Sequence, residues 1–107
     1  MIEEKLNKFP VEIKNMFSEI RGLVFKVAPN VIESLWAGLP SYSVSKEKFV
    51  RIIPFKDHIN IEALALKAYK DSLEGYIFTT KNMLQIFVGD TIPKNILLNA
   101  FKETLAI

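Results

Sequence analysis

Apolar residues recur at three- and four-residue steps between positions 9 and 27, and this spacing predicts an amphipathic helix. Pro10 suits the first turn of this helix, because its missing N–H would be unpaired there in any case. Pro29 predicts the end of the helix, since a proline disfavours helical geometry in the residue before it. A second stripe of this kind follows Pro93 and predicts a C-terminal helix. The apolar stripes are Ile13, Met16, Phe17, Ile20, Leu23, Val24 and Val27 in the first helix, and Ile96, Leu97, Ala100, Phe101 and Leu105 in the second.

The middle of the chain has the pattern of β-strands. The segment LWAGLPSYSV (35–44) predicts one strand kinked near Gly38, after a short helical turn over 31–34. KFVRIIPF is rich in β-formers, HINIEA alternates polar and apolar residues, and NMLQIFVG predicts a last strand. Turns are expected at Lys56-Asp57 and at Asn82, and a helix over ALALKAYKDSLEGY is expected to stop at Gly75.

These elements follow the order α-β-β-β-α-β-α. Strands in the middle with helices outside predict an α+β fold, in which an antiparallel sheet of about four to five strands is covered by the N- and C-terminal helices. The chain has 107 residues, and this length predicts a single domain over residues 1–107.

Composition narrows the function classes. The chain contains no cysteine, which excludes disulfides, a thiol nucleophile and thiolate metal ligands. Its 14 basic and 12 acidic side chains are interspersed and form no basic stripe, so no nucleic-acid partner is expected. No apolar stretch approaches the length of a membrane span, and the start MIEEKLNKFP lacks the apolar region of a signal peptide. We therefore expect a cytoplasmic protein without membrane contact, present as a monomer or a weak homodimer.

The kinked segment carries the candidate binding site. Trp36, Gly38, Pro40 and Tyr42 are evenly spaced, and if they share a face, two large rings flank a glycine and leave a hollow. The alternative is that both rings fill the core and the glycine only bends the chain.

The rim of this groove is expected to come from the turn that precedes HINIEA. Lys56 and His58 are predicted to lie there, with Lys56 binding an anionic group of the ligand.

Catalytic and metal chemistry are less well supported. A metal site needs about three or four protein ligands, and His58, the only histidine, has only Asn60 and Glu62 on its face. General-base catalysis would need a nucleophile beside His58, and the spacing does not require Ser41, Ser43 or Ser45 to be there. The best carboxylate groups all have cations nearby, which indicates solvated helical ion pairs. These groups are Glu12 with Glu19, and Asp71 with Glu74.

Several motifs together resemble the YdhG-like family of small bacterial domains, over about residues 10–105. They are Gly38-Leu39-Pro40-Ser41-Tyr42, Lys56-Asp57-His58, Asn82-Met83-Leu84-Gln85-Ile86 and Asp90-Thr91-Ile92-Pro93. Some members of that family are called frataxin-like intracellular iron chaperones. The resemblance therefore implies iron as an alternative cargo, delivered to iron–sulfur or haem assembly.

The preferred interpretation is a binding module without catalytic activity and without a cofactor. Its groove near the Gly-Leu-Pro kink would hold a small molecule or a protein, with Trp36, Gly38, Pro40, Tyr42, Lys56 and His58 as contacts. A frataxin-like iron chaperone is the alternative.

Overall fold

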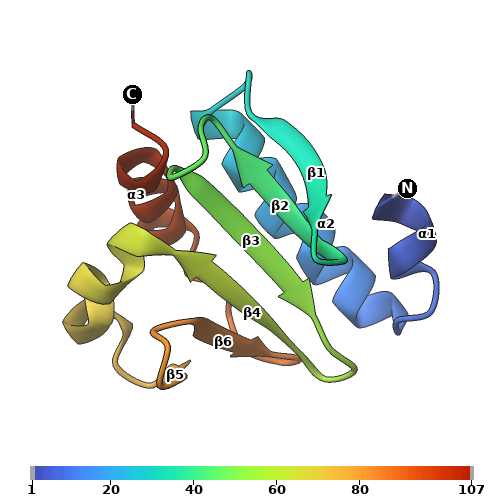
Figure 1. The fold of residues 1–107 in the computed structure, drawn as a ribbon. Helices are drawn as coiled ribbons and strands as arrows, with labels where there is room; N and C mark the ends of the chain where they lie inside the picture. The colour runs from blue at the N-terminus through green and yellow to red at the C-terminus, as the bar shows by residue number, and fades with distance from the viewer. Residues whose placement is uncertain (1, 107) are drawn as a thin grey trace.

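A computed structural model describes residues 2–106 and arranges six strands of this segment in one antiparallel sheet (Figure 1). The strand order across the sheet is β1-β2-β3-β4-β6-β5. The strands are β1 (Ile32–Trp36), β2 (Leu39–Ser43), β3 (Phe49–Pro54), β4 (His58–Ala63), β5 (Ile77–Phe78) and β6 (Leu84–Phe87). The predicted α+β class with an antiparallel sheet is confirmed, although the sheet has six strands rather than about four to five.

Helices cover one face of the sheet and leave the other uncovered, so that the uncovered face is turned toward the viewer in Figure 1. The helices are α1 (Ile2–Leu6), α2 (Val11–Val27) and α3 (Lys94–Thr104), and a 3-10 helix, η1 (Leu64–Leu73), follows β4. Both main helices begin directly after the predicted prolines, Pro10 and Pro93. Their apolar stripes are confirmed, because Ile13, Ile20 and Phe101 are completely buried.

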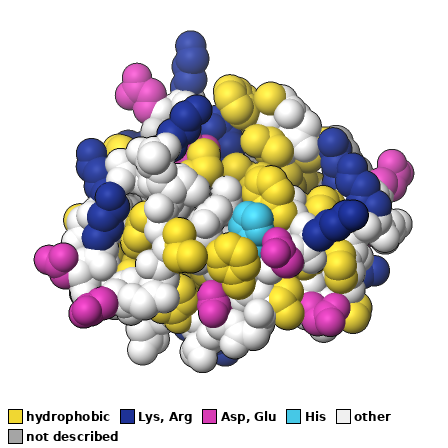
Figure 2. Space-filling view, turned by 90° about the horizontal axis from the view of Figure 1, so that it is seen from below, with side chains coloured by type: hydrophobic (Ala, Val, Ile, Leu, Met, Phe, Trp, Pro, Cys, Tyr) yellow, Lys and Arg dark blue, Asp and Glu magenta, His cyan; other side chains and the backbone are white. Residues whose placement is uncertain are grey.

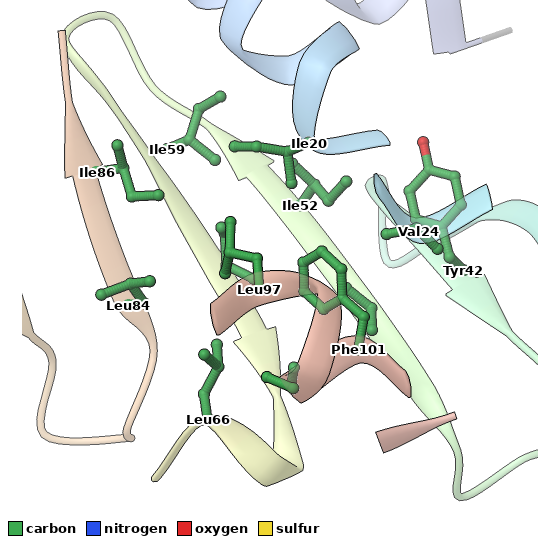
Figure 3. Close-up of a cluster of buried hydrophobic side chains, with 14 of the residues drawn as sticks. Ile20, Val24, Tyr42, Ile52, Ile59, Leu66, Leu84, Ile86, Leu97 and Phe101 are labelled. Carbon is green, nitrogen blue, oxygen red and sulfur yellow. The ribbon is translucent and has the colours of Figure 1, made fainter. Parts of the chain in front are cut away.

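The core lies between the sheet and the two long helices. Side chains alternate along each strand, and the apolar set points toward α2 and α3 (Figure 3). Its sheet members are Tyr42, Val50, Ile52, Ile59, Ile61, Ala63, Leu84 and Ile86. The opposite set forms what we call the open face. It consists of Ile32, Ser34, Trp36, Leu39, Ser41, Ser43, Phe49, Arg51, Ile53, His58, Asn60, Glu62, Ile77, Gln85 and Phe87.

The segment 35–44 differs from its prediction. It forms the end of β1 and all of β2, which pair through a two-residue turn at Ala37-Gly38. Both turn residues have positive φ, 49° and 80°, as the tight turn of a β-hairpin requires. Gly38 suits such a turn, but alanine rarely adopts this conformation, so the pair lacks the Asn, Asp or Gly that usually occupies the first position. The expected helical turn over 31–34 is likewise wrong, because β1 begins at Ile32.

The remaining turns agree with the sequence. The β3–β4 connection closes around Lys56-Asp57, where the Phe55 N–H donates to the His58 carbonyl at 2.8 Å. Asn82 has the expected positive φ of 64°, and Gly75, at 96°, follows the helical segment it was expected to stop. That segment is a 3-10 helix rather than an α-helix.

Replacement of Gly38 tests the hairpin turn. We expect Gly38→Val to lower the free energy of unfolding by about 1–3 kcal/mol, because a β-branched residue is strained at positive φ. Urea unfolding measures this change. Gly22→Ala in α2 is the matched control: an added Cβ there meets no atom within 4 Å, so stability should rise by up to about 1 kcal/mol. A Gly38→Val variant as stable as the wild type would contradict the assigned turn.

Candidate binding site on the open face

Arg51 lies on the open face, in the internal strand β3. Its guanidinium carbon lies 3.8 Å from the centre of the Trp36 ring and 3.9 Å from that of Phe49. Its Nη1 donates to the Glu62 carboxylate at 3.0 Å, and only 11% of its side chain is exposed. A planar cation held between two rings in this way fixes both rings on the surface.

A shallow hollow of about 210 Å³ adjoins this stack. It is lined by Ser34, Leu35, Trp36, Ser41, Ser43, Ser45, Lys46, Phe49 and Arg51. The strand register builds it, because Ser34, Ser41 and Arg51 form one row across β1, β2 and β3. Ser43 and Phe49 belong to the next row.

The polar groups of this hollow are mostly unpaired. Within residues 2–106, none of its four serine hydroxyls makes a side-chain hydrogen bond, and Lys46 makes no ion pair. Glu62 pairs with Arg51 from outside, and no carboxylate lines the hollow itself. The hollow is therefore a concave surface rich in donors and positive in charge.

A larger hollow of about 430 Å³ between α1 and α2 has a different character. Its Arg21 and Glu33 side chains bind each other, with Nε and Oε2 2.5 Å apart. This hydrogen bond holds the pKa of the Glu33 carboxyl below its usual range. Because this pair neutralises itself, we take the serine-lined hollow as the candidate site.

The structure separates the residues that were predicted to form a groove. Trp36 is 55% exposed on the open face, whereas Tyr42 is completely buried against the helices. The two-residue turn causes this, since it pairs Trp36 with Leu39 and so places Pro40 and Tyr42 on the opposite face. Gly38 lies in the turn itself, where an added Cβ would approach Lys5 Nζ at 3.3 Å. The predicted hollow between Trp36 and Tyr42 is therefore wrong. Of the alternative, in which both rings fill the core, only the part that concerns Tyr42 is confirmed, because Trp36 is exposed.

Tyr42 is a core residue with a buried hydroxyl. That hydroxyl makes no hydrogen bond with the described residues. Burial raises the pKa of the phenol, and the neighbouring Glu33 carboxylate raises it further. The ring packs edge-on against Phe25, with ring centres 5.9 Å apart. Tyr42 therefore stays protonated and supports the core rather than a ligand.

Lys56 and His58 do not line the serine hollow. His58 stacks between Phe55 and Phe87, with ring centres 4.5 and 4.8 Å away. Its Nδ1 lies 2.8 Å from the Asp57 carboxylate. Figure 2 shows this histidine, in cyan, between hydrophobic side chains, with an acidic side chain beside it. The imidazole is thus the middle member of an aromatic cluster at the β3–β4 turn. Lys56 is exposed in that turn.

Sequence reasoning missed Ser34, Lys46, Phe49 and Arg51 as site residues. Part of the signal was available, because the alternation in SYSVS places Ser41, Ser43 and Ser45 on one face. From the spacing alone, these serines are candidates only for a nucleophile beside His58. The pairing of Ser41 with Arg51 depends on the β2–β3 register, which the pattern alone does not specify.

The carboxylates considered for iron stay dispersed. No group of three or more His, Asp or Glu side chains suitable for a metal comes together among residues 2–106. Glu19 forms an ion pair with Lys94 at 3.3 Å.

None of the helices described is long and apolar enough to cross a membrane.

Comparison of the chain with protein-family models, curated proteins and solved structures yields no match. The resemblance to the YdhG-like family consequently stays a prediction.

Arg51→Lys tests the central stack. Lysine keeps the charge but lacks the planar group that contacts both rings, so we expect about 1 kcal/mol less stability and a red shift of Trp36 emission. Glu62→Gln is the control, because it removes the ion pair and keeps the stack; it should leave the emission unchanged. Equal red shifts in the two variants would show that the ion pair, rather than the stack, positions Trp36.

Anaerobic titration with Fe(II), followed by calorimetry, tests the iron alternative. We expect no sub-micromolar binding, because the described carboxylates are dispersed and Glu19 is paired with a lysine. Sub-micromolar binding that is lost in the Glu12→Ala/Glu19→Ala double variant would instead support an iron chaperone.

Proposed function

We propose that this protein is a non-enzymatic binding module that holds a small, ring-bearing anion in the serine-lined hollow of its open face. The observation that supports this function most directly is the lining of the hollow. Two cationic side chains and four hydroxyls meet there without a carboxylate.

The charge of the hollow selects an anion. Arg51 is partly neutralised by Glu62, but Lys46 makes no ion pair with residues 2–106. Serine hydroxyls donate readily to phosphate or carboxylate oxygens, and hydrogen bonds that involve an ionised group are the stronger ones. Lys46 therefore takes the role that the sequence suggested for Lys56.

The aromatic walls and the size of the hollow define the rest of the ligand. Trp36 is half exposed and held in place by Arg51, so it offers a preorganised surface for stacking. The volume of about 210 Å³ is below the roughly 300–1,000 Å³ of pockets for larger ligands. This size fits one ring with one anionic group.

Binding without catalysis is favoured by the residues present. General-base catalysis at a serine needs a base within hydrogen-bonding reach. His58 is engaged with Phe55, Asp57 and Phe87 and does not line the hollow. The iron chaperone role, which follows from the family resemblance alone, stays the alternative prediction.

Titration with phenyl phosphate tests the proposal. We expect saturable changes in Trp36 fluorescence and in the amide NMR signals of Ser41 and Ser43. Lys46→Ala should weaken binding about tenfold, the effect of one hydrogen bond to a charged group. Lys56→Ala is the matched control and should bind like the wild type.

Two further probes separate the contributions. Inorganic phosphate and phenol should each bind more weakly than phenyl phosphate, because each lacks one half of the recognised chemistry. Equal losses in the Lys46 and Lys56 variants would indicate non-specific charge attraction, and no saturable binding of any of the three probes would rule out the proposal.

A further inference from the structure

The two edges of the sheet differ in how well they are protected. The β5 edge has only two residues, whereas β1 presents five. Within residues 2–106, no strand pairs with the outer side of β1, and no other backbone group bonds to it. Exposed edges are usually blunted by lysine, proline, short length or a covering helix. The sequence of β1 is IESLW, and α1 lies beside it (Figure 1), where it borders the side chains of Glu33 and Leu35 on the core side of the strand. Its single charged residue, Glu33, forms an ion pair with Arg21.

The hairpin determines which groups of β1 face outward. In a two-residue turn the flanking residues, here Trp36 and Leu39, form the hydrogen-bonded pair. Bonded and non-bonded pairs alternate along an antiparallel ladder. Ile32, Ser34 and Trp36 therefore direct their backbone groups toward β2, and Glu33 and Leu35 direct theirs to the free edge.

The side chains of β1 are self-complementary in one register. We propose that two copies of this chain pair through antiparallel β1 strands about a two-fold axis at Ser34. Glu33 then exchanges both backbone hydrogen bonds with the partner's Leu35. Ile32 lies opposite the partner's Trp36 on the open face, in a non-hydrogen-bonded pair, where side chains approach most closely.

Exposure on the open face agrees with this register. Ile32 is 65% exposed and Trp36 is 55% exposed. Both belong to the side of β1 opposite α1, which instead borders Glu33 and Leu35. The register thus covers the two exposed apolar side chains of the edge strand, Ile32 and Trp36, with each other.

The covered area indicates a weak dimer. An aromatic side chain buries about 150–250 Å² in full, so two half-exposed Trp36 rings and two Ile32 side chains contribute on the order of 400–500 Å². With the paired backbones, the interface stays below the roughly 1,200 Å² of standard stable complexes. The partner's Ile32 would also lie beside Trp36, at the wall of the serine-lined hollow, although the pairing does not depend on any ligand.

Sedimentation equilibrium tests the association. We expect the average mass of the wild type to rise from monomer toward dimer between about 10 µM and about 1 mM, the range for a small interface. Ile32→Lys should remain monomeric throughout. Ile77→Lys is the matched control, since Ile77 is 55% exposed on the same face but lies in the opposite edge strand; it should behave like the wild type.

A cysteine placed on the axis tests the register. Opposed residues of a non-bonded pair have Cα atoms about 4.5 Å apart, within the range of a disulfide. The chain has no cysteine, so Ser34→Cys should form cross-linked dimers on mild oxidation, at several times the yield of Ser43→Cys. Ser43 lies on the same face but in the internal strand β2.

Three results would overturn the proposal. They are a wild type that is monomeric at about 1 mM, loss of association in Ile77→Lys, and equal cross-linking of the two cysteine variants. The second of these would indicate head-to-tail pairing of β1 with β5.

Discussion

The two-residue turn at Ala37-Gly38 is the constraint on which the open face depends. It sets the β1–β2 register, and a change of one residue in register would exchange the two faces of a strand. Because the turn pairs Trp36 with Leu39, the tryptophan lies on the open face while Tyr42 enters the core. The row of Ser34, Ser41 and Arg51 follows from this register. The hollow therefore depends on the positive φ values of Ala37 and Gly38, because they make this turn possible.

Arg51 holds the side chains that this register brings together on the open face. An arginine in the middle of a half-buried sheet face needs partners for its charge, and it has two rings and the Glu62 carboxylate. Its Nε is buried without a hydrogen bond to the described residues. Burying Nε without a hydrogen bond is unfavourable, but the same placement of Arg51 holds Trp36 and Phe49 at fixed positions beside the serines.

The open face thus has two parts with different chemistry. Around Ser34, Ser41 and Ser43 it is concave, lined by hydroxyl groups and bordered by Lys46, which suits an anion. Near the β3–β4 turn, the surface is formed by the stacked rings of Phe55, His58 and Phe87. His58 is held in place by packing against both rings and by its contact with the Asp57 carboxylate. His58, the only histidine of the sequence, therefore lies outside the serine-lined hollow.

The sequence alone determined the two main helices, because the apolar stripes of α2 and α3 and their leading prolines are local signals. It also determined the α+β class and the turns at Lys56-Asp57, Gly75 and Asn82. The tertiary structure decided where the chain reverses between Trp36 and Leu39, since alanine at positive φ has no local signature. It also decided which open-face residues meet, because cross-strand neighbours such as Trp36 and Arg51 are set by register and packing rather than by spacing along the chain.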